Sequence, residues 1–357
     1  WKRAAAEALG RGEAAGRPLS LSFSLSLSLM AWRAAVAAGS RAAGAARRLR
    51  LVRPRQWRAA SSQSPAAAAA ATAAAEAAAA AATKGHPGHM ALTRHLPRGE
   101  ELVEARVVEV VAETPTVTRL ALELPVVGGA TPLRFAAGQW VDTYIPGVDV
   151  VGGFSMVSSP LELPRLELAV RGSPHPPAHW CCEVARPGDE VSVRVGGDFG
   201  LDEALLGDFL RGGARVLLLA GGIGVNPLLS VYRTLDLAYG AAAAAAAEEG
   251  EESLAPGRCH MLYSARTEDE FAFRDEIEAR AAERPGMLSC SFQTTQAAGG
   301  ARLGAEDVLR CVEQLRSDTA PGEALVAFIC GPPSFTDDME GWAKAAGVDD
   351  VRLERWW

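Results

Sequence analysis

This sequence of 357 residues has no Cys-x-x-Cys pair and no metal-ligand cluster, and no basic stripe dominates its globular part. The six cysteines are scattered without any Cys-x-x-Cys spacing, which argues against a disulfide framework or a structural zinc site and suits a reducing compartment. A net charge of −7 and a pI of about 5.5 argue against a nucleic-acid-binding surface. We therefore expect no metal site and no nucleic-acid partner in a chain long enough for two domains.

The first 97 residues differ in composition from the rest. Between Met30 and Glu76 there is no acidic residue, whereas eight arginines lie between Arg33 and Arg58. An arginine-rich, acid-free start is typical of an organelle transit peptide, because a cationic helix is drawn towards a negative membrane potential. Arginine interrupts the apolar stretches well before the roughly 20 residues that span a bilayer, so we expect no stable membrane insertion. We interpret residues 1–97 as a disordered targeting and low-complexity region that directs the chain to the mitochondrial matrix. The alternative is a disordered low-complexity region that carries no targeting signal.

Three low-complexity stretches are interpreted as connections rather than core. Residues 1–29 precede the first methionine, Met30, and we expect them to be an extension of the gene model or a disordered lead. The alanine run 66–82 is a poor core builder and indicates a linker. The tract 238–257 interrupts well-patterned sequence, so we expect a loop inserted at the surface, since long insertions cost little loop entropy.

Residues 98–205 consist of short β-like segments separated by turn residues. Six segments are rich in Val, Leu and Thr, and several alternate apolar and polar residues, as half-buried antiparallel strands do. Six such segments in about 100 residues predict a small closed antiparallel barrel. We expect one short helix at residues 178–185, between the fifth and sixth strands, because the two prolines ahead of it suit a helix start.

Residues 206–357 alternate apolar strands with amphipathic helices. Strand-like runs begin at Ala214, Arg258, Met287 and Ala324, and a helical pattern follows each of them. Continuous apolar strands that alternate with helices imply a parallel sheet covered on both faces, as in a Rossmann-like nucleotide domain. Ligands bind such sheets beyond the carboxyl ends of the strands.

Two glycine-containing turns follow strands at what we expect to be one edge of that sheet. Gly221, Gly222 and Gly224 follow the first strand, and the sequence CGPP, which starts at Cys330, ends the last apolar run. Glycine allows positive φ and close approach of backbone to ligand, and a helix N-terminus offers free N–H groups to a pyrophosphate. The spacing of the glycines is not the Gly-x-Gly-x-x-Gly fingerprint, so a tight turn that binds no ligand stays the alternative interpretation. For Cys330 the alternative is a small buried residue without a role in binding, since free cysteine is commonly buried.

A barrel followed by a nucleotide domain with GGIGVNP and CGPP resembles the ferredoxin–NADP reductase-like superfamily, over roughly residues 100–357. The resemblance implies a fold, a six-stranded antiparallel flavin-type barrel before a Rossmann-like NAD-binding domain. It also implies an oxidoreductase, in which NAD(P)H gives a hydride to FAD on the barrel and the flavin passes electrons to an unidentified acceptor. The difficult chemistry then belongs to the cofactors, and the protein supplies their placement.

The resemblance also assigns roles to individual residues. The turn that holds the nucleotide pyrophosphate matches Gly221, Gly222, Ile223, Gly224, Val225, Asn226 and Pro227. The turn beside the nicotinamide matches Cys330, Gly331 and Pro332. The aromatic and the hydroxyl of a flavin-binding Arg-x-Tyr-Ser motif match Phe154 and Ser155. A C-terminal aromatic over the flavin matches Trp357, with Trp356 before it. Ser155 and Cys330 are the candidate catalytic residues.

One departure from the Arg-x-Tyr-Ser motif concerns the flavin. The arginine that neutralises the flavin phosphate in the family falls at Gly152, and the tyrosine is replaced by Phe154. Arg171, His175 and His179 are candidates for the missing donors, since they lead into the helix start where the family binds flavin pyrophosphate. The loss favours an alternative function, a nucleotide-binding sensor or scaffold that kept the fold and lost flavin chemistry.

The choice between NAD(H) and NADP(H) stays open. It depends on the end of the second parallel strand, where an arginine favours a 2′-phosphate and a carboxylate favours a free ribose hydroxyl. Ser264 and Arg266 favour the phosphate, whereas Glu268 and Asp269 follow closely and favour the hydroxyl.

Overall fold

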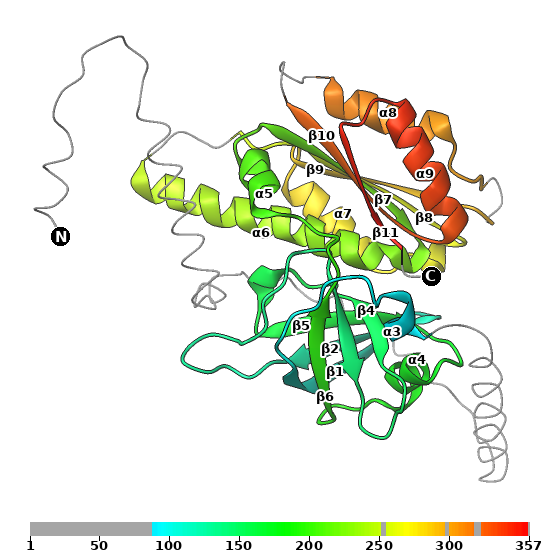
Figure 1. The fold of residues 1–357 in the computed structure, drawn as a ribbon. Helices are drawn as coiled ribbons and strands as arrows, with labels where there is room; N and C mark the ends of the chain where they lie inside the picture. The colour runs from blue at the N-terminus through cyan, green and yellow to red at the C-terminus, as the bar shows by residue number, and fades with distance from the viewer. Residues whose placement is uncertain (1–87, 251–254, 297–299, 318–322, 356–357) are drawn as a thin grey trace, which may run out of the picture.

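The computed structural model describes residues 88–250, 255–296, 300–317 and 323–355, which form two lobes, each built on one sheet (Figure 1). The lobes follow each other along the chain, the antiparallel one first, as predicted. The segment before residue 88, to which we assign the targeting signal, lies outside the described residues, as do the C-terminal Trp356 and Trp357.

The first lobe is the predicted six-stranded antiparallel barrel, with strand order β4-β3-β6-β1-β2-β5. The strands are β1 Val103–Thr114, β2 Val117–Glu123, β3 Trp140–Tyr144, β4 Gly152–Ser155, β5 Arg165–Arg171 and β6 Glu190–Gly196. A bridge between Met156 and Leu168 joins the chain after β4 to β5 and closes the barrel. At the start of β1, every second residue is buried, because alternate side chains of a strand point into the barrel.

Short helices complete the barrel. The expected helix between β5 and β6 is present as α4 Pro176–His179 and the π-helical turn η3 Trp180–Val184, and η2 Pro160–Glu162 precedes β5. Residues 88–97, which we assigned from the sequence to the low-complexity region, carry α3 His89–Leu92 and pack on the barrel. His89 Nε2 lies 2.9 Å from Asp142 Oδ1 on β3, and the ring of His89 contacts Trp140 edge-on.

The second lobe is a parallel five-stranded sheet with strand order β11-β10-β7-β8-β9. Its strands are β7 Ala214–Gly221, β8 Cys259–Ala265, β9 Leu288–Thr294, β10 Ala324–Cys330 and β11 Asp350–Glu354. Its helices are α5 Glu203–Leu210, η4 Gly222–Gly224, α6 Val225–Glu249, η5 Glu268–Glu270, α7 Arg274–Glu283, α8 Ala305–Arg316 and α9 Pro333–Ala345.

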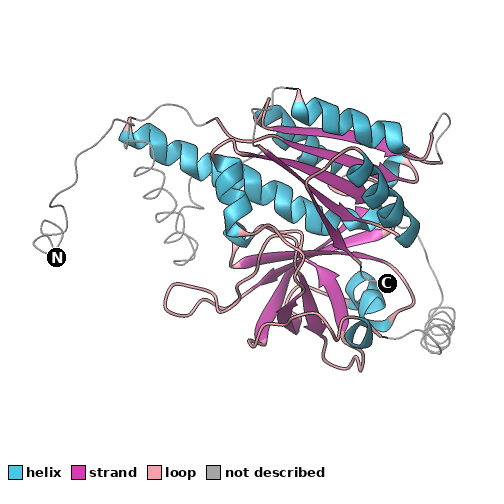
Figure 2. Cartoon of the chain, turned by 45° about the horizontal axis from the view of Figure 1, so that its top comes forward, coloured by secondary structure: helices cyan, strands magenta, loops and turns pink. Residues whose placement is uncertain are grey.

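Helices cover both faces of the parallel sheet (Figure 2). Val216 and Leu218 of β7 belong to the apolar cluster that includes α6, whereas Leu217 and Leu219 belong to the cluster that includes α8 and α9. A strand buried on both faces requires a continuous apolar sequence, which explains why β7 shows no polar alternation.

Helix α6 corrects one expectation. We expected residues 238–257 to form a surface loop, but α6 continues to Glu249 and ends where Gly250 takes a left-handed conformation with φ 72°. The reason is that alanine has the highest helix propensity, so an alanine tract extends a helix that tertiary packing has already started. The first half of α6 lies between the two lobes, and its C-terminal end projects past the sheets (Figures 1 and 2).

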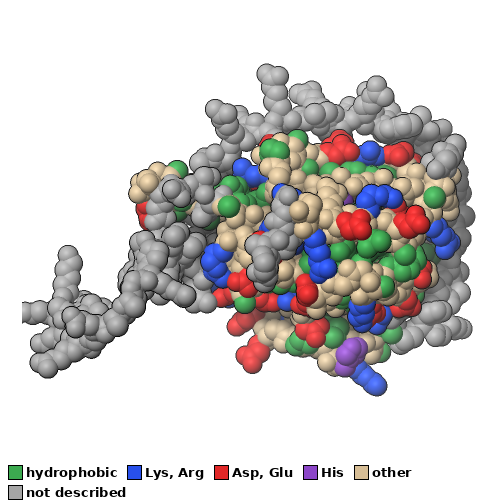
Figure 3. Space-filling view, turned by 90° about the horizontal axis from the view of Figure 1, so that it is seen from above, with side chains coloured by type: hydrophobic (Ala, Val, Ile, Leu, Met, Phe, Trp, Pro, Cys, Tyr) green, Lys and Arg blue, Asp and Glu red, His purple; other side chains and the backbone are tan. Residues whose placement is uncertain are grey.

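The surface carries charges of both signs. On the face shown in Figure 3, acidic and basic side chains are interspersed among apolar and neutral ones. Even the 25-residue α6 carries Arg233 and Asp236 in its first half. Among the described residues, no helix combines the length and the apolar character that a membrane span requires.

Candidate functional site

The two glycine turns lie side by side at the carboxyl edge of the parallel sheet. β7 and β10 pair in parallel, with Ala220 opposite Cys330. A Cβ on Gly331 would lie 3.1 Å from the Cα of Gly221, and a Cβ on Gly224 would lie 2.2 Å from the carbonyl oxygen of Cys330. These glycines are therefore required for the packing of one turn on the other, whether or not a ligand is bound.

Gly222 is the glycine that faces open space. Its φ is +55°, and apart from its chain neighbours only Arg171, among the described residues, comes within 4 Å of where a Cβ would lie. It begins η4, directly before the N-terminus of α6, which offers free N–H groups and a partial positive charge. The backbone at Gly222 is the place in this turn where a phosphate has room to approach.

The other residues of the turn have structural roles. Val225, Asn226 and Pro227 are buried in the first turn of α6, and Ile223 is half-buried against the core. Asn226 Nδ2 donates to the carbonyl oxygen of Ala169 in β5 at 2.7 Å, so this side chain ties the turn to the barrel.

Cys330 is fully buried, and its side chain belongs to the apolar cluster between the sheet and α6. The carbonyl of Cys330, rather than its thiol, packs against Gly224. Gly331 packs against Phe335 and Gly221, while Pro332 is the N-cap of α9.

Phe154 and Ser155 point to opposite faces of the barrel wall. In the antiparallel register, Ser155 lies opposite Trp140 and Phe154 lies opposite Val141, and directly opposed residues share a face. Phe154 packs on the barrel core with Val141, whereas Ser155 lies on the outer face with Trp140. The side chains of the two predicted flavin-binding residues thus do not converge.

The residues around Gly152 do not fit FAD held by its pyrophosphate. A Cβ on Gly152 would lie 2.6 Å from the Phe154 ring and 2.8 Å from Cβ of Pro177, so the space of an arginine side chain is filled. Helix α4 has four residues and begins with two prolines, which have no N–H to donate. Burial, followed by the charge of the neighbouring His89, lowers the pKa of His175 at its N-cap and so disfavours a cation there. His179 is the last residue of α4, and Arg171 lies beside Gly222.

Glu354 is a titratable residue at this edge that the sequence pattern did not indicate. It ends β11 opposite Cys330 in the parallel register and is almost completely buried. Burial, followed by repulsion from Asp198, raises the pKa of Glu354 to about 7. A carboxyl group with such a pKa is able to hold or release a proton near neutral pH. No signal in the sequence marked it, because we predicted no strand at residues 350–354, where the structure has β11.

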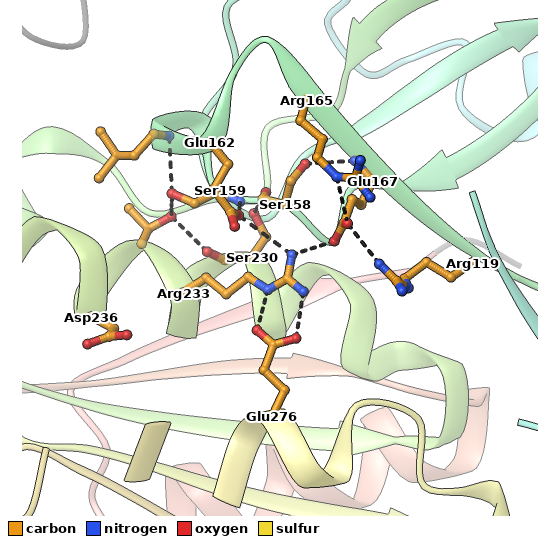
Figure 4. A network of polar contacts seen from close by, with 12 residues as sticks. Arg119, Ser158, Ser159, Glu162, Arg165, Glu167, Ser230, Arg233, Asp236 and Glu276 are labelled. Atoms are coloured by element: carbon orange, nitrogen blue, oxygen red, sulfur yellow. Dashed lines mark hydrogen bonds and ion pairs between the residues drawn. The ribbon is translucent and has the colours of Figure 1, made fainter. Parts of the chain in front are cut away.

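Arg233 on α6 joins the two lobes (Figure 4). Its Nη1 donates to Glu167 of β5 at 2.8 Å, and its Nε and Nη2 donate to the two oxygens of Glu276 on α7 at 2.7 Å. Burial alone would raise the pKa of Glu276, but Arg233 and Arg280 outweigh it and lower that pKa to about 2. This paired network holds the barrel against α6 and α7.

Comparison with known proteins agrees with this architecture. Residues 218–341 match the family model of the oxidoreductase NAD-binding domain. Over 287 residues the chain is 36% identical to oxidoreductase NAD-binding domain-containing protein 1 of Danio rerio, covering 75% of this chain and 97% of that protein. The Bos taurus protein of the same name is 37% identical over 285 residues, covering 77% of this chain and 87% of that protein.

Among solved structures, an Amycolatopsis cytochrome P450 reductase superposes with a TM-score of 0.55 at 22% identity, covering 72% of this chain and 70% of that one. That likeness shows a shared fold of barrel and nucleotide domain. Because more than a third of its aligned residues match the Danio rerio and Bos taurus proteins, and because it spans 97% of the former, the chain belongs to the family of oxidoreductase NAD-binding domain-containing protein 1.

Proposed function

We propose that this protein is an NAD(P)H-dependent oxidoreductase that passes a hydride to a flavin, from which electrons go on to a further acceptor. The observation that carries the proposal is the meeting of the turns at Gly222 and Cys330 on the carboxyl edge of the parallel sheet, beside the barrel. The matching oxidoreductase NAD-binding domain and the reductase fold support it.

Each part of the site has a role in this proposal. Gly222 and the start of α6 would hold the dinucleotide pyrophosphate, and the turn of Cys330 and Gly331 would lie beside the nicotinamide. When both are bound, NAD(P)H would supply a hydride and be left as NAD(P)⁺, and the flavin would be reduced by that hydride together with one proton. Glu354, whose pKa burial and Asp198 raise to about 7, is a candidate at this edge for the group that would hold that proton.

The flavin in this proposal is exchangeable rather than a tightly bound FAD. The arginine of the phosphate contact is absent, and Pro177 and the Phe154 ring fill its place. Binding then depends on the flavin ring, for which the hydroxyl of Ser155, a half-buried residue, is a candidate hydrogen-bond donor.

The same observation at Gly152 favours a second function, a nucleotide-binding sensor or scaffold without flavin chemistry. Two measurements distinguish the oxidoreductase from the sensor. The first is the absorbance of the purified chain in the flavin bands, and the second is the rate of NADH and NADPH oxidation with riboflavin, FMN, FAD or an artificial acceptor. We expect oxidation of a reduced nicotinamide nucleotide that requires an added acceptor. A colourless chain that binds NADH and reduces none of these acceptors would support the sensor.

We also propose delivery to the mitochondrial matrix, on the strength of the eight arginines and the absence of acids between Met30 and Glu76. Residues 30–97 fused to a fluorescent protein should carry it into mitochondria. A variant with the eight arginines changed to glutamine is the control and should stay in the cytosol. Equal distribution of both fusions would contradict the proposal.

A further inference from the structure

We propose that Glu113, near the end of barrel strand β1, is a positioning residue of the nucleotide site, which holds the turn between β8 and α7, residues 266–273, from the barrel side. The inference rests on the proposed binding of NAD(P)H at Gly222, and Glu113 acts through the backbone of the turn. The contact that carries it is a hydrogen bond between the two lobes, in which the N–H of Phe273 donates to Glu113 Oε1 at 3.0 Å.

Phe273 has a backbone conformation that needs support from its surroundings. Its φ is +61°, and among the described residues it is the only one other than glycine with a positive φ. Such a conformation is rare for a bulky residue and persists only where the surrounding contacts fix it. Phe273 is also almost completely buried, so its N–H would be left unsatisfied at a cost if Glu113 did not accept from it.

Glu113 takes the part that a side chain of α7 itself plays at many helix starts. Phe273 is the N-cap of α7, and the N–H of an N-cap residue is often bonded by the side chain three residues later, as Asp307 does at the start of α8 at 2.9 Å. In α7 that later residue is Glu276, and both of its carboxylate oxygens accept from Arg233 (Figure 4). Because Glu276 is bound to α6, the start of α7 depends on a carboxylate from the other lobe.

The turn 266–273 lies beside the glycine turn. Strands β7 and β8 pair in parallel with Gly221 opposite Ser264, so the residues that follow the two strands meet at the carboxyl edge of the sheet. In the strand order, β10 and β8 lie on opposite sides of β7. With the pyrophosphate at Gly222 and the nicotinamide half beside Cys330, the adenosine half would therefore extend towards the turn 266–273.

The bond to Glu113 orders this turn before a nucleotide binds. When a turn is loosened, the apparent affinity falls with the fraction of molecules in which the turn is in place. The middle of the turn has its own support, because the ring of Phe271 packs edge-on against Tyr263 of β8 and Phe292 of β9, with centroids 4.9 Å and 5.1 Å away. Loss of Glu113 should therefore loosen the end of the turn without unfolding the lobe.

The test is titration of the full chain with NADH, ADP-ribose and reduced nicotinamide mononucleotide. Glu113→Met removes the acceptor at similar length. It should raise the dissociation constants of NADH and ADP-ribose about fivefold, the effect of a turn that is in place in about one-fifth of the molecules. The mononucleotide lacks the adenosine half, so its dissociation constant should stay unchanged.

Two further variants provide the rescue and the control. Glu113→Gln keeps an acceptor oxygen and should recover most of the affinity for NADH and ADP-ribose. Glu109 lies on the same strand and forms ion pairs with Arg119 and Arg165, both of the barrel. Glu109→Met is therefore the matched control and should leave the affinities for all three probes unchanged.

Two results would overturn the assignment of Glu113. One is an unchanged affinity for ADP-ribose in a folded Glu113→Met chain. The other is an equal loss of affinity for all three probes, which a general loosening of the fold would give. Thermal unfolding shows whether each variant is folded. If Glu113→Met is not, Glu113→Asp, which keeps the charge but is too short for the bond, takes its place with the same expected pattern.

Failure of the proposed function would give a different result from failure of this assignment. A wild type that binds the three probes, with the expected effects of Glu113→Met, but reduces no acceptor would contradict the oxidoreductase and still support the role of Glu113. A wild type that oxidises NADH with an acceptor, and whose affinity for ADP-ribose is the same in Glu113→Met, would support the oxidoreductase and overturn the role of Glu113.

Discussion

Gly224 packs on the main chain of Cys330, with the position of a Cβ only 2.2 Å from the Cys330 carbonyl oxygen and 2.7 Å from the nitrogen of Gly331. The atoms in the way belong to the backbone of a central strand, so they cannot turn aside as a flexible side chain does. The two turns that form the candidate nucleotide site are close together because this residue has no side chain.

Gly224→Ala should therefore destabilise the protein by about 1–3 kcal/mol, the usual cost of overpacking a core, and weaken NADH binding by pushing the turns apart. Chemical denaturation and an NADH titration measure the two effects. Gly341→Ala is the control, because Gly341 lies in α9 with open space around it. Alanine there should be neutral or stabilising by up to about 1 kcal/mol. Equal effects of the two substitutions would contradict the close packing.

The free energy of unfolding should decrease as the pH rises from about 4.5 to about 7, because of Glu354. Burial and Asp198 raise the pKa of Glu354 from 4.5 to about 7, so the folded state holds the proton more tightly than the unfolded state. The stabilisation is present below the unfolded pKa and is lost as the pH rises through the folded one, by up to about 3 kcal/mol. Denaturation of the wild type and of Glu354→Gln across this range tests the point. If both lose stability in parallel, Glu354 is not the group responsible.

The carboxylate of Asp142 should be essential to the barrel. It is fully buried, and hydrogen bonds from His89, Arg98 and Arg194 outweigh the effect of burial and lower its pKa to about 2. Asp142→Asn leaves the two arginines without their carboxylate and should cost about 3–5 kcal/mol. The stability due to this carboxylate should be lost in acid, as the pH falls from about 4 to about 2.

Glu190→Gln provides the comparison for Asp142. Glu190 forms an exposed ion pair with Arg106, in which both side chains are more than 60% exposed, and such pairs contribute about 0–1 kcal/mol. Denaturation of the two variants at neutral pH should therefore separate them clearly. A cost for Asp142→Asn as small as that for Glu190→Gln would show that the buried cluster does not stabilise the barrel.

Local patterns in the sequence were sufficient for the six barrel strands and for four of the five parallel strands with the helices that follow them, whereas strand β11 and helices α3 and α5 were not predicted. The apolar run of β7, the glycines after it and the helical spacing of α6 are consecutive, so the strand–turn–helix unit was predictable, as was the meeting of its turn with Cys330 in a parallel sheet. The end of α6 was not predictable in this way. An alanine tract on its own is compatible with a loop, and it becomes helical here because it continues a helix that tertiary packing has already started.

Long-range packing explains what the sequence did not reveal. His89 and Asp142 are 53 residues apart, and nothing near either one indicates the pairing. The position of Arg171 beside Gly222 depends on how β5 lies along α6, and the pKa of Glu354 depends on its burial in the assembled sheet. Residues whose role arises from contacts between distant parts of the chain carry no local pattern.

Anaerobic mixing of the purified chain with NADH and, in turn, riboflavin, FMN and FAD tests the central claim most directly. If the flavin is bound through its ring, NADH should be oxidised in step with flavin reduction. The apparent affinities of the three flavins should then differ by less than about tenfold, because their phosphates contribute little. A chain that binds NADH but reduces none of the three flavins would contradict the account.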